Sequence, residues 1–472
     1  MGKKVHVIGI CGAGMSATAK LLRDAGWIVS GSDSGAYPPM SDYLARIGIS
    51  FSASYRPENI PRDVDVIIIG KNAQLLPDQN VEVRAAYQSR AYITSFPHML
   101  GTLTQDRHNV VVCGSYGKST LTTLVVWILL CAKKDPGYFI GALPLDLPYS
   151  SSIGLDDEFI IEGDEYPSGQ DDPSSKFLHY HPTDIILSSA DHDHVNVFPT
   201  HESYLTTFRK LLNHMPDEGL LVVCADNPHA IGLIPKRHTR TITYGVSIGD
   251  WHARDIVFGE TSSFSLVHRG KTLGNITTTL LGAHNIQNIV GACAYVLERN
   301  LVSFTTLRGA IAMFHGLERR LNKITSTSSV PAYEGFGSSL QKAKSAIDAI
   351  KLHFPKRRLV VFFEPYTFSW RDRLALSWYD EVFEGCDQVY LYPPPSLGSA
   401  SHDQLSSHDI LNRIIAAHIS VAPISTPQAA HDVIERDITP NDVVLFLSSG
   451  SFGGIISEAS RRLDYKFSSS TT

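Results

Sequence analysis

The stretch GSYGKST, residues 114–120, has the residue types that hold a nucleoside triphosphate. Two glycines free the backbone to wrap phosphate oxygens, a lysine can reach the β- and γ-phosphates, and a hydroxyl can bind Mg²⁺. The strict pattern has a further glycine where Val112 stands, so this is the short form, Gly-x-x-Gly-Lys-Ser. We predict an ATP site, the alternative being a helix N-terminus with a chance lysine. Its candidate residues are Gly114, Gly117, Lys118, Ser119 and Thr120.

Acidic side chains and histidines follow two further apolar runs. Glu162, Asp164 and Glu165 come at the end of a predicted strand, and residues 191–194 read Asp-His-Asp-His. Carboxylates at a strand end, in the domain of a phosphate loop, suit a Mg²⁺ that bridges phosphates. The alternative for the first group is a solvated strand end. In the second group, at least one side chain is predicted to face a metal or the transferred phosphoryl group.

Two pairs of polar residues lie further along the chain. Asn285 and Asn288 are three apart on one face of a predicted helix and could read a purine edge through amide hydrogen bonds. The alternative is helix capping, with Asn285 at or near the N-cap. Arg319 and Arg320 could fix phosphate charge between two domains, although an arginine pair on an ordinary surface is the alternative.

A second glycine turn, VIGICGAGM, occupies residues 7–15. Gly9, Gly12 and Gly14 permit a tight turn and the close approach of a phosphate to a helix N-terminus. Asp33 ends the next strand, where a ribose contact would lie in a dinucleotide-binding fold. A plain strand–helix turn and an exposed strand-end aspartate are the alternatives.

The elements that must position these residues alternate between strands and helices. A continuous apolar strand from Val5 to Ile10 precedes an amphipathic helix from Met15 to Ala25, and similar pairs recur along the chain. This alternation predicts an α/β fold with parallel, doubly wound sheets. The length of 472 residues and the positions of the motifs predict three domains, at residues 1–106, 107–322 and 323–472.

Composition narrows the class of protein. Hydrophobic residues make up 43% and charged residues 19%, as in ordinary globular proteins. The net charge of -6 argues against a general nucleic-acid or anionic-membrane binder. Six scattered cysteines predict buried thiols in a reducing compartment, without disulfides or a zinc site. No secretory signal or membrane-length apolar run is visible, so we expect a cytoplasmic protein.

Taken together and in this order, the motifs resemble those of the Mur ligase family over essentially the whole chain. Within the family, the resemblance is nearest to the murein peptide ligases, followed by the UDP-N-acetylmuramate–L-alanine ligases. The motifs that carry it are GICGAGM, SGSDSGAYPPMSDYL, GSYGKST, EGDEY, DHVNVF, GAHNIQN, LERRL and SSGSFGG. YPPMS and SGSFGG favour the peptide ligases.

The resemblance explains why one chain carries two phosphate-binding turns. It implies a Rossmann-like first domain that holds a UDP-sugar, a central P-loop ATPase-like domain, and a Rossmann-like third domain that brings the amine. In this family ATP phosphorylates the carboxylate of UDP-N-acetylmuramate. The amine of an amino acid or peptide then attacks the acyl phosphate, giving an amide, ADP and phosphate. Such an enzyme would act in peptidoglycan synthesis or recycling, as a monomer or homodimer.

The resemblance also implies roles for individual residues. Lys118 would contact the ATP phosphates, Ser119 and Glu162 would bind one Mg²⁺, and His194 a second. The amides of Asn285 and Asn288 would line the adenine site, and Arg319 or Arg320 would touch ATP. The UDP-sugar would be held by Gly9, Gly12, Gly14, Met15 and Asp33.

Several positions depart from the family pattern. Relatives have a histidine where Tyr116 stands, a threonine at Ser119, an asparagine pair at Ser188 and Ser189, and a glutamate at Asp191. The largest departure is in the third domain. An acidic residue and two histidines of the relatives are replaced here by Gly335, Ser338 and Ser339.

These departures leave two alternatives to a standard ligase. The chain could be a repurposed ligase with another carboxylate or amine, or a catalytically weak relative that binds nucleotide. A nicotinamide dehydrogenase built on the first glycine turn would not explain the second loop. The sequence leaves open the amine, the oligomeric state, and whether the third-domain departures mean new specificity or lost activity.

Overall fold

The computed structural model describes residues 2–35, 40–72, 74–236, 240–395 and 404–468. Tyr37, Pro38 and Pro39 of the YPPMS motif lie outside these residues. The chain forms two compact units, which are described separately. The first comprises Met1–Asp255, Phe264–Thr277 and His284–Phe314, and the second comprises Ile256–Ser263, Thr278–Ala283 and His315–Thr472. The domain boundaries near 106 and 322 stay predictions.

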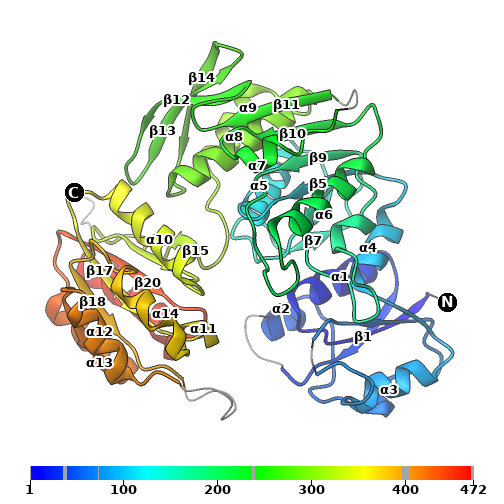
Figure 1. The fold of residues 1–472 in the computed structure, drawn as a ribbon, viewed down its shortest axis with the longest axis horizontal. Helices are drawn as coiled ribbons and strands as arrows, with labels where there is room; N and C mark the ends of the chain where they lie inside the picture. Colours follow the sequence, from blue (N-terminus) through cyan, green and yellow to red (C-terminus); the bar gives the residue numbers. More distant parts are fainter. Residues whose placement is uncertain (1, 36–39, 73, 237–239, 396–403, 469–472) are drawn as a thin grey trace. The chain divides into compact units, whose positions relative to one another are not determined.

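The first unit begins with a parallel four-stranded sheet in the order β2-β1-β3-β4, drawn in blue in Figure 1. The first predicted strand is shorter than expected, because it ends at Ile8 and the glycine turn starts at Gly9. The strands of this four-stranded sheet are β1 (Lys4–Ile8), β2 (Ile28–Ser32), β3 (Val66–Ile69) and β4 (Tyr92–Thr94). Its helices are α1 (Ala13–Asp24), α2 (Met40–Arg46), η1 (Pro57–Asn59), α3 (Val81–Gln88) and α4 (Phe96–Thr104).

The same unit contains most of a ten-stranded sheet, in the order β14-β13-β12-β11-β10-β9-β5-β8-β6-β7. Its strands are β5 (His108–Cys113), β6 (Gly137–Phe139), β7 (Ser151–Ser152), β8 (Glu158–Gly163), β9 (Asp184–Leu187), β10 (Leu220–Cys224), β11 (Arg240–Gly245), β12 (Trp251–Val257), β13 (Ser262–His268) and β14 (Lys271–Thr278). The accompanying helices are α5 (Lys118–Cys131), η2 (Lys176–His179), α6 (His201–Asn213), α7 (Pro228–Ile231), α8 (Ala283–Glu298) and α9 (Phe304–Ala312). Strand β5 pairs in parallel with both β8 and β9.

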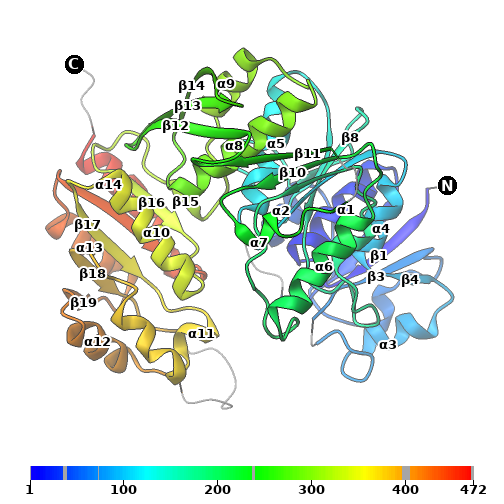
Figure 2. The same cartoon turned by 45° about the horizontal axis from the view of Figure 1, so that its top comes forward.

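The second unit is built on a six-stranded sheet in the order β15-β16-β20-β17-β18-β19. Buried residues of α10 and α12 belong to one apolar cluster and those of α13 and α14 to another, so helices cover both faces (Figure 2). The strands are β15 (Arg320–Lys323), β16 (Ala332–Gly335), β17 (Arg358–Phe363), β18 (Gln388–Leu391), β19 (Val421–Pro423) and β20 (Asp442–Leu447). The helices are α10 (Leu340–His353), α11 (Phe368–Arg371), η3 (Arg373–Asp380), α12 (Ser407–Ala416), α13 (Pro427–Asp437), η4 (Phe452–Gly454) and α14 (Ile455–Lys466).

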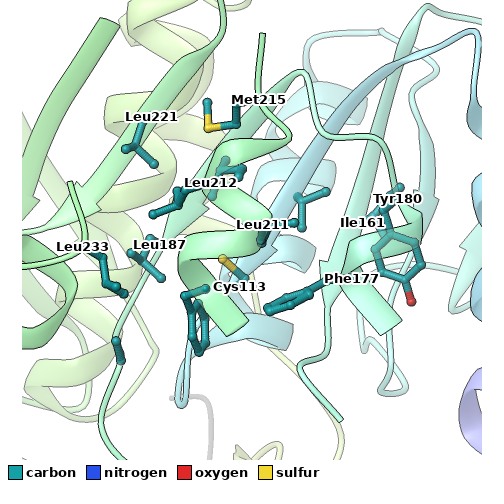
Figure 3. Packing of buried hydrophobic residues seen from close by; sticks show 14 of the residues in the cluster. Cys113, Ile161, Phe177, Tyr180, Leu187, Leu211, Leu212, Met215, Leu221 and Leu233 are labelled. Atoms are coloured by element: carbon teal, nitrogen blue, oxygen red, sulfur yellow. The ribbon is translucent and has the colours of Figure 1, made fainter. Parts of the chain in front are cut away.

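Helices α1 and α4, which accompany the four-stranded sheet, contribute side chains to the buried apolar cluster of the ten-stranded sheet. Figure 3 shows part of it, with side chains from β5, β9, β10 and α6 packed together. The cluster also takes in Ala17 and Leu21 of α1, together with Phe139 of β6. Ser151 of β7 donates a hydrogen bond to the carbonyl of Ala17 at 2.8 Å. Because burial of apolar surface stabilises both sheets at once, the unit packs as one body.

Three of the six cysteines, Cys113, Cys224 and Cys293, are buried as predicted, whereas Cys11, Cys131 and Cys386 are only partly buried. All six cysteines are free thiols. Within the described ranges, no helix combines the length and apolar character needed to cross a bilayer.

A buried carboxylate ties β9 to its surroundings. Asp184 is fully buried and accepts hydrogen bonds from the Arg299 Nε at 2.8 Å, the backbone amide of Leu220 at 2.7 Å and the ring of His108 at 2.8 Å. Burial alone would raise the pKa of Asp184, but these hydrogen bonds outweigh it and lower the pKa. A carboxyl whose folded pKa is lowered contributes stability above its unfolded pKa of about 4 and loses it in acid.

We therefore expect Asp184→Asn to lower the free energy of unfolding by about 3 kcal/mol at neutral pH, because it leaves Arg299 without its counter-charge. The difference from the unsubstituted protein should shrink as the pH falls below about 4. Chemical denaturation across this pH range measures both effects. Glu218→Gln, at an exposed position just before β10, is the matched control. An equal loss for both variants would contradict the role given to Asp184.

Candidate functional site

Three adjacent parallel strands end at the same level of the ten-stranded sheet. Cys113, the last residue of β5, is paired with Gly163 of β8 and with Leu187 of β9. The phosphate loop, the acidic group after β8 and the Asp-His-Asp-His stretch after β9 therefore meet at one edge. The chain passes from β5 to β6 on one side of β5, and later from β8 to β9 on the other side. Open α/β sheets bind their ligands where the connections change direction in this way.

The predicted ATP-binding lysine is held by a buried acid. Lys118, the first residue of α5, places its Nζ 2.8 Å from the Glu165 carboxylate, which is fully buried. The hydroxyl of Tyr204 donates to the other Glu165 oxygen at 3.0 Å. Burial would lower the pKa of Lys118, but the charges of Glu165, Asp164 and Glu162 raise it above the usual value. Lys118 is therefore a fixed cation.

A hydroxyl and a second carboxylate lie beside this pair. The Ser119 hydroxyl donates to Glu162 at 2.6 Å, and the backbone amide of Gly141 donates to the other Glu162 oxygen at 2.7 Å. These oxygen donors fit Mg²⁺, which commonly binds one or two protein oxygens, several waters and substrate phosphates. In the described part of the chain, no group of three or more His, Cys, Asp or Glu side chains is arranged to hold a metal ion by itself.

Of the Asp-His-Asp-His stretch, His194 lies nearest to the acidic group. Its Nε2 is 3.5 Å from Glu165 and its ring lies edge-on to Tyr166, with centroids 5.1 Å apart. His192 instead hydrogen-bonds the carbonyl of Phe198 at 2.7 Å. The assignment of Ser119, Glu162 and His194 as metal ligands stays a prediction.

Two serines that follow β9, Ser188 and Ser189, hold the phosphate loop in place. Ser188 donates hydrogen bonds to the carbonyls of Cys113 and Tyr116. The Ser189 hydroxyl accepts from the amide of Tyr116 at 3.0 Å. From the sequence, Ser188 and Ser189 were noted only as departures from the family pattern. In the structure their hydroxyls contact the carbonyl and the amide of Tyr116 in the loop.

Loop glycines make room for the neighbouring backbone and an asparagine. Gly117 has φ 82°, and a Cβ there would lie 2.5 Å from Oδ1 of Asn288. At Gly114, a Cβ would meet the Ser188 hydroxyl at 2.3 Å. Asn288 donates to Asn285 at 3.2 Å inside α8, so the pair lies against the loop. Asn285 belongs to the first turn of the helix, and the proposed contact with adenine stays a prediction.

The first glycine turn is held by the aspartate predicted to contact ribose. Asp33 follows β2 and accepts the backbone amide of Cys11 at 2.9 Å. It also accepts the amide of Gly35 at 2.8 Å and the hydroxyl of Tyr55 at 3.2 Å. Asp33 thus orders the turn itself, and its contact with a ribose stays a prediction, as do the UDP-sugar contacts of Gly9, Gly12, Gly14 and Met15.

The remaining candidates belong to the second unit. Arg319 donates to Glu334 at 3.2 Å and to the carbonyl of Ser448 at 3.0 Å, so it joins β16 to the turn after β20. Arg320 is the first residue of β15. Contact of either arginine with ATP stays a prediction.

The third-domain departures from the family pattern also have structural roles in this unit. Gly335 ends β16 and is buried. Ser338 accepts a hydrogen bond from the side chain of Lys342 at 3.3 Å, and Ser339 caps the N-terminus of α10. None of these three residues carries an acidic or imidazole side chain.

Comparison with known proteins identifies the family. Residues 4–108 match the catalytic domain of the Mur ligase family, and residues 112–296 match the Mur ligase middle domain. The chain belongs to the Mur ligase family. The resemblance read from the motifs is therefore confirmed.

Relatives match over nearly the full length of the chain. A UDP-N-acetylmuramate–L-alanine ligase of Sorangium cellulosum is 29% identical over 469 residues, covering 98% of this chain and 97% of its own length. The crystal structure of a murein peptide ligase from Psychrobacter arcticus is 25% identical, with a TM-score of 0.68 and coverage of 98% and 99%. A UDP-N-acetylmuramate–alanine ligase from Thermotoga maritima, 20% identical with a TM-score of 0.79 and the same coverage, shares the fold. The predicted α/β architecture is confirmed.

We expect Ser189→Ala to weaken the binding of a non-hydrolysable Mg-ATP analogue about fivefold. The reason is that the hydrogen bond ordering Tyr116 contributes about 1 kcal/mol. Calorimetric titration measures the dissociation constant. Ser303→Ala removes a similar backbone hydrogen bond, at the N-cap of α9, and should leave nucleotide affinity unchanged. Unchanged affinity in Ser189→Ala would show that the loop holds its shape without the serine.

Restoring the acid of the relatives in the third domain should destabilise this chain. A Cβ at Gly335 would lie 2.9 Å from Leu447 Cδ2 and 3.6 Å from Leu321, so the carboxylate of Gly335→Asp would enter an apolar cluster. We expect a loss of about 3 kcal/mol in unfolding free energy. At Gly309 in α9 a Cβ would meet nothing within 4 Å, so Gly309→Asp is the control. Denaturation curves that coincide for the two variants would refute this expectation.

Proposed function

We propose that this protein is an ATP-dependent amide ligase that joins an amino acid or peptide to the carboxylate of UDP-N-acetylmuramate, in peptidoglycan synthesis or recycling. The observation that carries the proposal is the fixed cation of Lys118 beside the Ser119–Glu162 pair, where β5, β8 and β9 end. Family membership and the full-length match to ligases of this substrate support it.

The chemistry explains why these residues are needed. A carboxylate is a poor electrophile, because an amine attacking it would have to expel oxide. Phosphorylation gives it a leaving group, and negative charge gathers on the phosphoryl oxygens as that group is transferred. Lys118 is positioned to offset this charge, and Glu165 keeps the ammonium oriented toward the loop. A bound Mg²⁺ would supply further positive charge to the phosphates.

The acidic group also favours a working enzyme over a catalytically weak relative. The carboxylates of Glu162 and Glu165 are brought together with Lys118 by hydrogen bonds from Ser119, Gly141 and Tyr204. Folding tolerates two acids and a lysine in a largely buried site because their hydrogen bonds are satisfied. We propose that Gly335, Ser338 and Ser339 of the second unit alter which amine the enzyme accepts. A cytoplasmic location stays a prediction.

The test is a product assay with Mg-ATP, UDP-N-acetylmuramate and a panel of amines that includes L-alanine and the tripeptide L-alanyl-γ-D-glutamyl-meso-diaminopimelate. We expect mass spectrometry to find one amide product, formed together with ADP and phosphate. Lys118→Ala should slow its formation by about 10³-fold or more, because the loop loses its cation.

Lys134→Ala, just beyond the far end of α5, is the matched control and should react at the normal rate. A shift in melting temperature with UDP-N-acetylmuramate should survive in Lys118→Ala, which would show that the variant is folded. The proposal fails if the unsubstituted protein forms no amide and hydroxylamine traps no acyl phosphate.

A further inference from the structure

Two lysines of the first unit converge on one aromatic ring. Lys71 Nζ lies 5.5 Å from the ring centroid of Tyr166, and Lys176 Nζ lies 5.7 Å from the same centroid. The Tyr166 hydroxyl accepts a hydrogen bond from Asn196 at 3.1 Å, which fixes the ring. Lys71 follows β3 of the four-stranded sheet and Lys176 begins η2, so the lysine pair is assembled from two distant segments.

Only one of the two lysines forms a direct ion pair among the described residues. Lys176 is paired with Asp164 at 2.5 Å, and Asp172 accepts from His179 at 2.8 Å and from Ser174 at 2.5 Å. Lys71 makes neither a hydrogen bond nor an ion pair with any residue that the structure describes. Partial burial and the nearby charge of Lys176 lower the pKa of Lys71, and Asp172 offsets this only in part. An anion placed here would give Lys71 a direct counter-charge.

One side of the lysine pair borders the first glycine turn. Strand β3 pairs in parallel with β1, so Lys71 and Gly9 emerge at the same edge of the sheet. The ring of Phe96 forms a second link. A Cβ at Gly14 would lie 2.9 Å from that ring, and Lys176 Nζ lies 5.4 Å from its centroid.

The other side borders the phosphate loop. Asp164, the partner of Lys176, is adjacent in sequence to Glu165, which holds Lys118. Tyr166 contacts the ring of His194. The lysine pair therefore lies between the turn predicted to hold UDP and the loop predicted to hold ATP.

We propose that Lys71 and Lys176 bind the carboxylate of the nucleotide-sugar substrate and present it to the phosphate loop. This inference rests on the proposed function. Ammonium groups are compact point charges with three donors each, which suits a carboxylate arriving from one direction. The two cations keep it ionised, and the ionised form is the one that can attack phosphorus.

The experiment compares two ligands that differ in the carboxylate. UDP-N-acetylglucosamine has the same nucleotide and amino sugar as UDP-N-acetylmuramate but lacks the lactyl ether and its carboxylate. Calorimetric titration of both ligands gives the contribution of that group in each variant. In Lys71→Met we expect binding of UDP-N-acetylmuramate to weaken by about 10- to 100-fold, as for a lost hydrogen bond to a charged group. Binding of UDP-N-acetylglucosamine should change by less than about threefold.

Two further variants complete the design. Lys3 also lies over an aromatic ring, 5.2 Å from the centroid of Trp27, but it precedes β1 at the opposite end of the strands. Lys3→Met should bind both ligands normally, and Lys71→Arg should keep most of the affinity because it keeps the charge.

Equal weakening of both ligands in Lys71→Met would overturn the inference, since it would place the lysine on the diphosphate. Unchanged binding of both would overturn it as well. If the unsubstituted protein does not prefer UDP-N-acetylmuramate over UDP-N-acetylglucosamine, the proposed function itself fails and the inference falls with it.

Discussion

The ion pair between Lys118 and Glu165 is the contact on which the site depends. Both groups leave bulk water, and removing two charges from water costs free energy that only close pairing and further hydrogen bonds can offset. The 2.8 Å contact, together with the Tyr204 hydroxyl on the second carboxylate oxygen, supplies that compensation. Lys118 begins α5, Glu165 follows β8 and Tyr204 lies in α6, so the pair can form only when the sheet and these helices are correctly packed. The geometry of the candidate site therefore depends directly on correct folding of the first unit.

The first glycine turn also depends on packing against the ten-stranded sheet. Helix α1, which begins at the turn, buries Ala17 and Leu21 in the cluster that also packs β5, β8 and β9. A rearrangement of one sheet would expose apolar surface on the other. The spacing between the two turns is thus set by packing within the first unit, and this allows residues such as Lys71 and Lys176 to bridge them.

Local patterns were sufficient to predict much of this molecule. Glycine spacing and apolar runs located both turns and the strands before them, because these features act over a few residues. The partners of the site could not be predicted in the same way. The sequence has three acids at and just after the end of β8, and nothing in it indicated that Glu165, and not Glu162, would form the ion pair with Lys118. The ribose contact predicted for Asp33 stays a prediction, and its hydrogen bond to the amide of Cys11 was not predicted. Such pairings depend on strand register between segments far apart in sequence, which no local pattern encodes.

The serines at the end of β9 have a kinetic consequence. Ser188 and Ser189 hold the backbone of Tyr116 through its carbonyl and its amide, so hydrogen bonds from the protein restrain the loop. When a ligand binds a loop that is already restrained, the loop loses little conformational entropy and need not rearrange first. Capture of the nucleotide should then be limited by diffusion and orientation, with differences in affinity among nucleotides appearing mainly as differences in residence time.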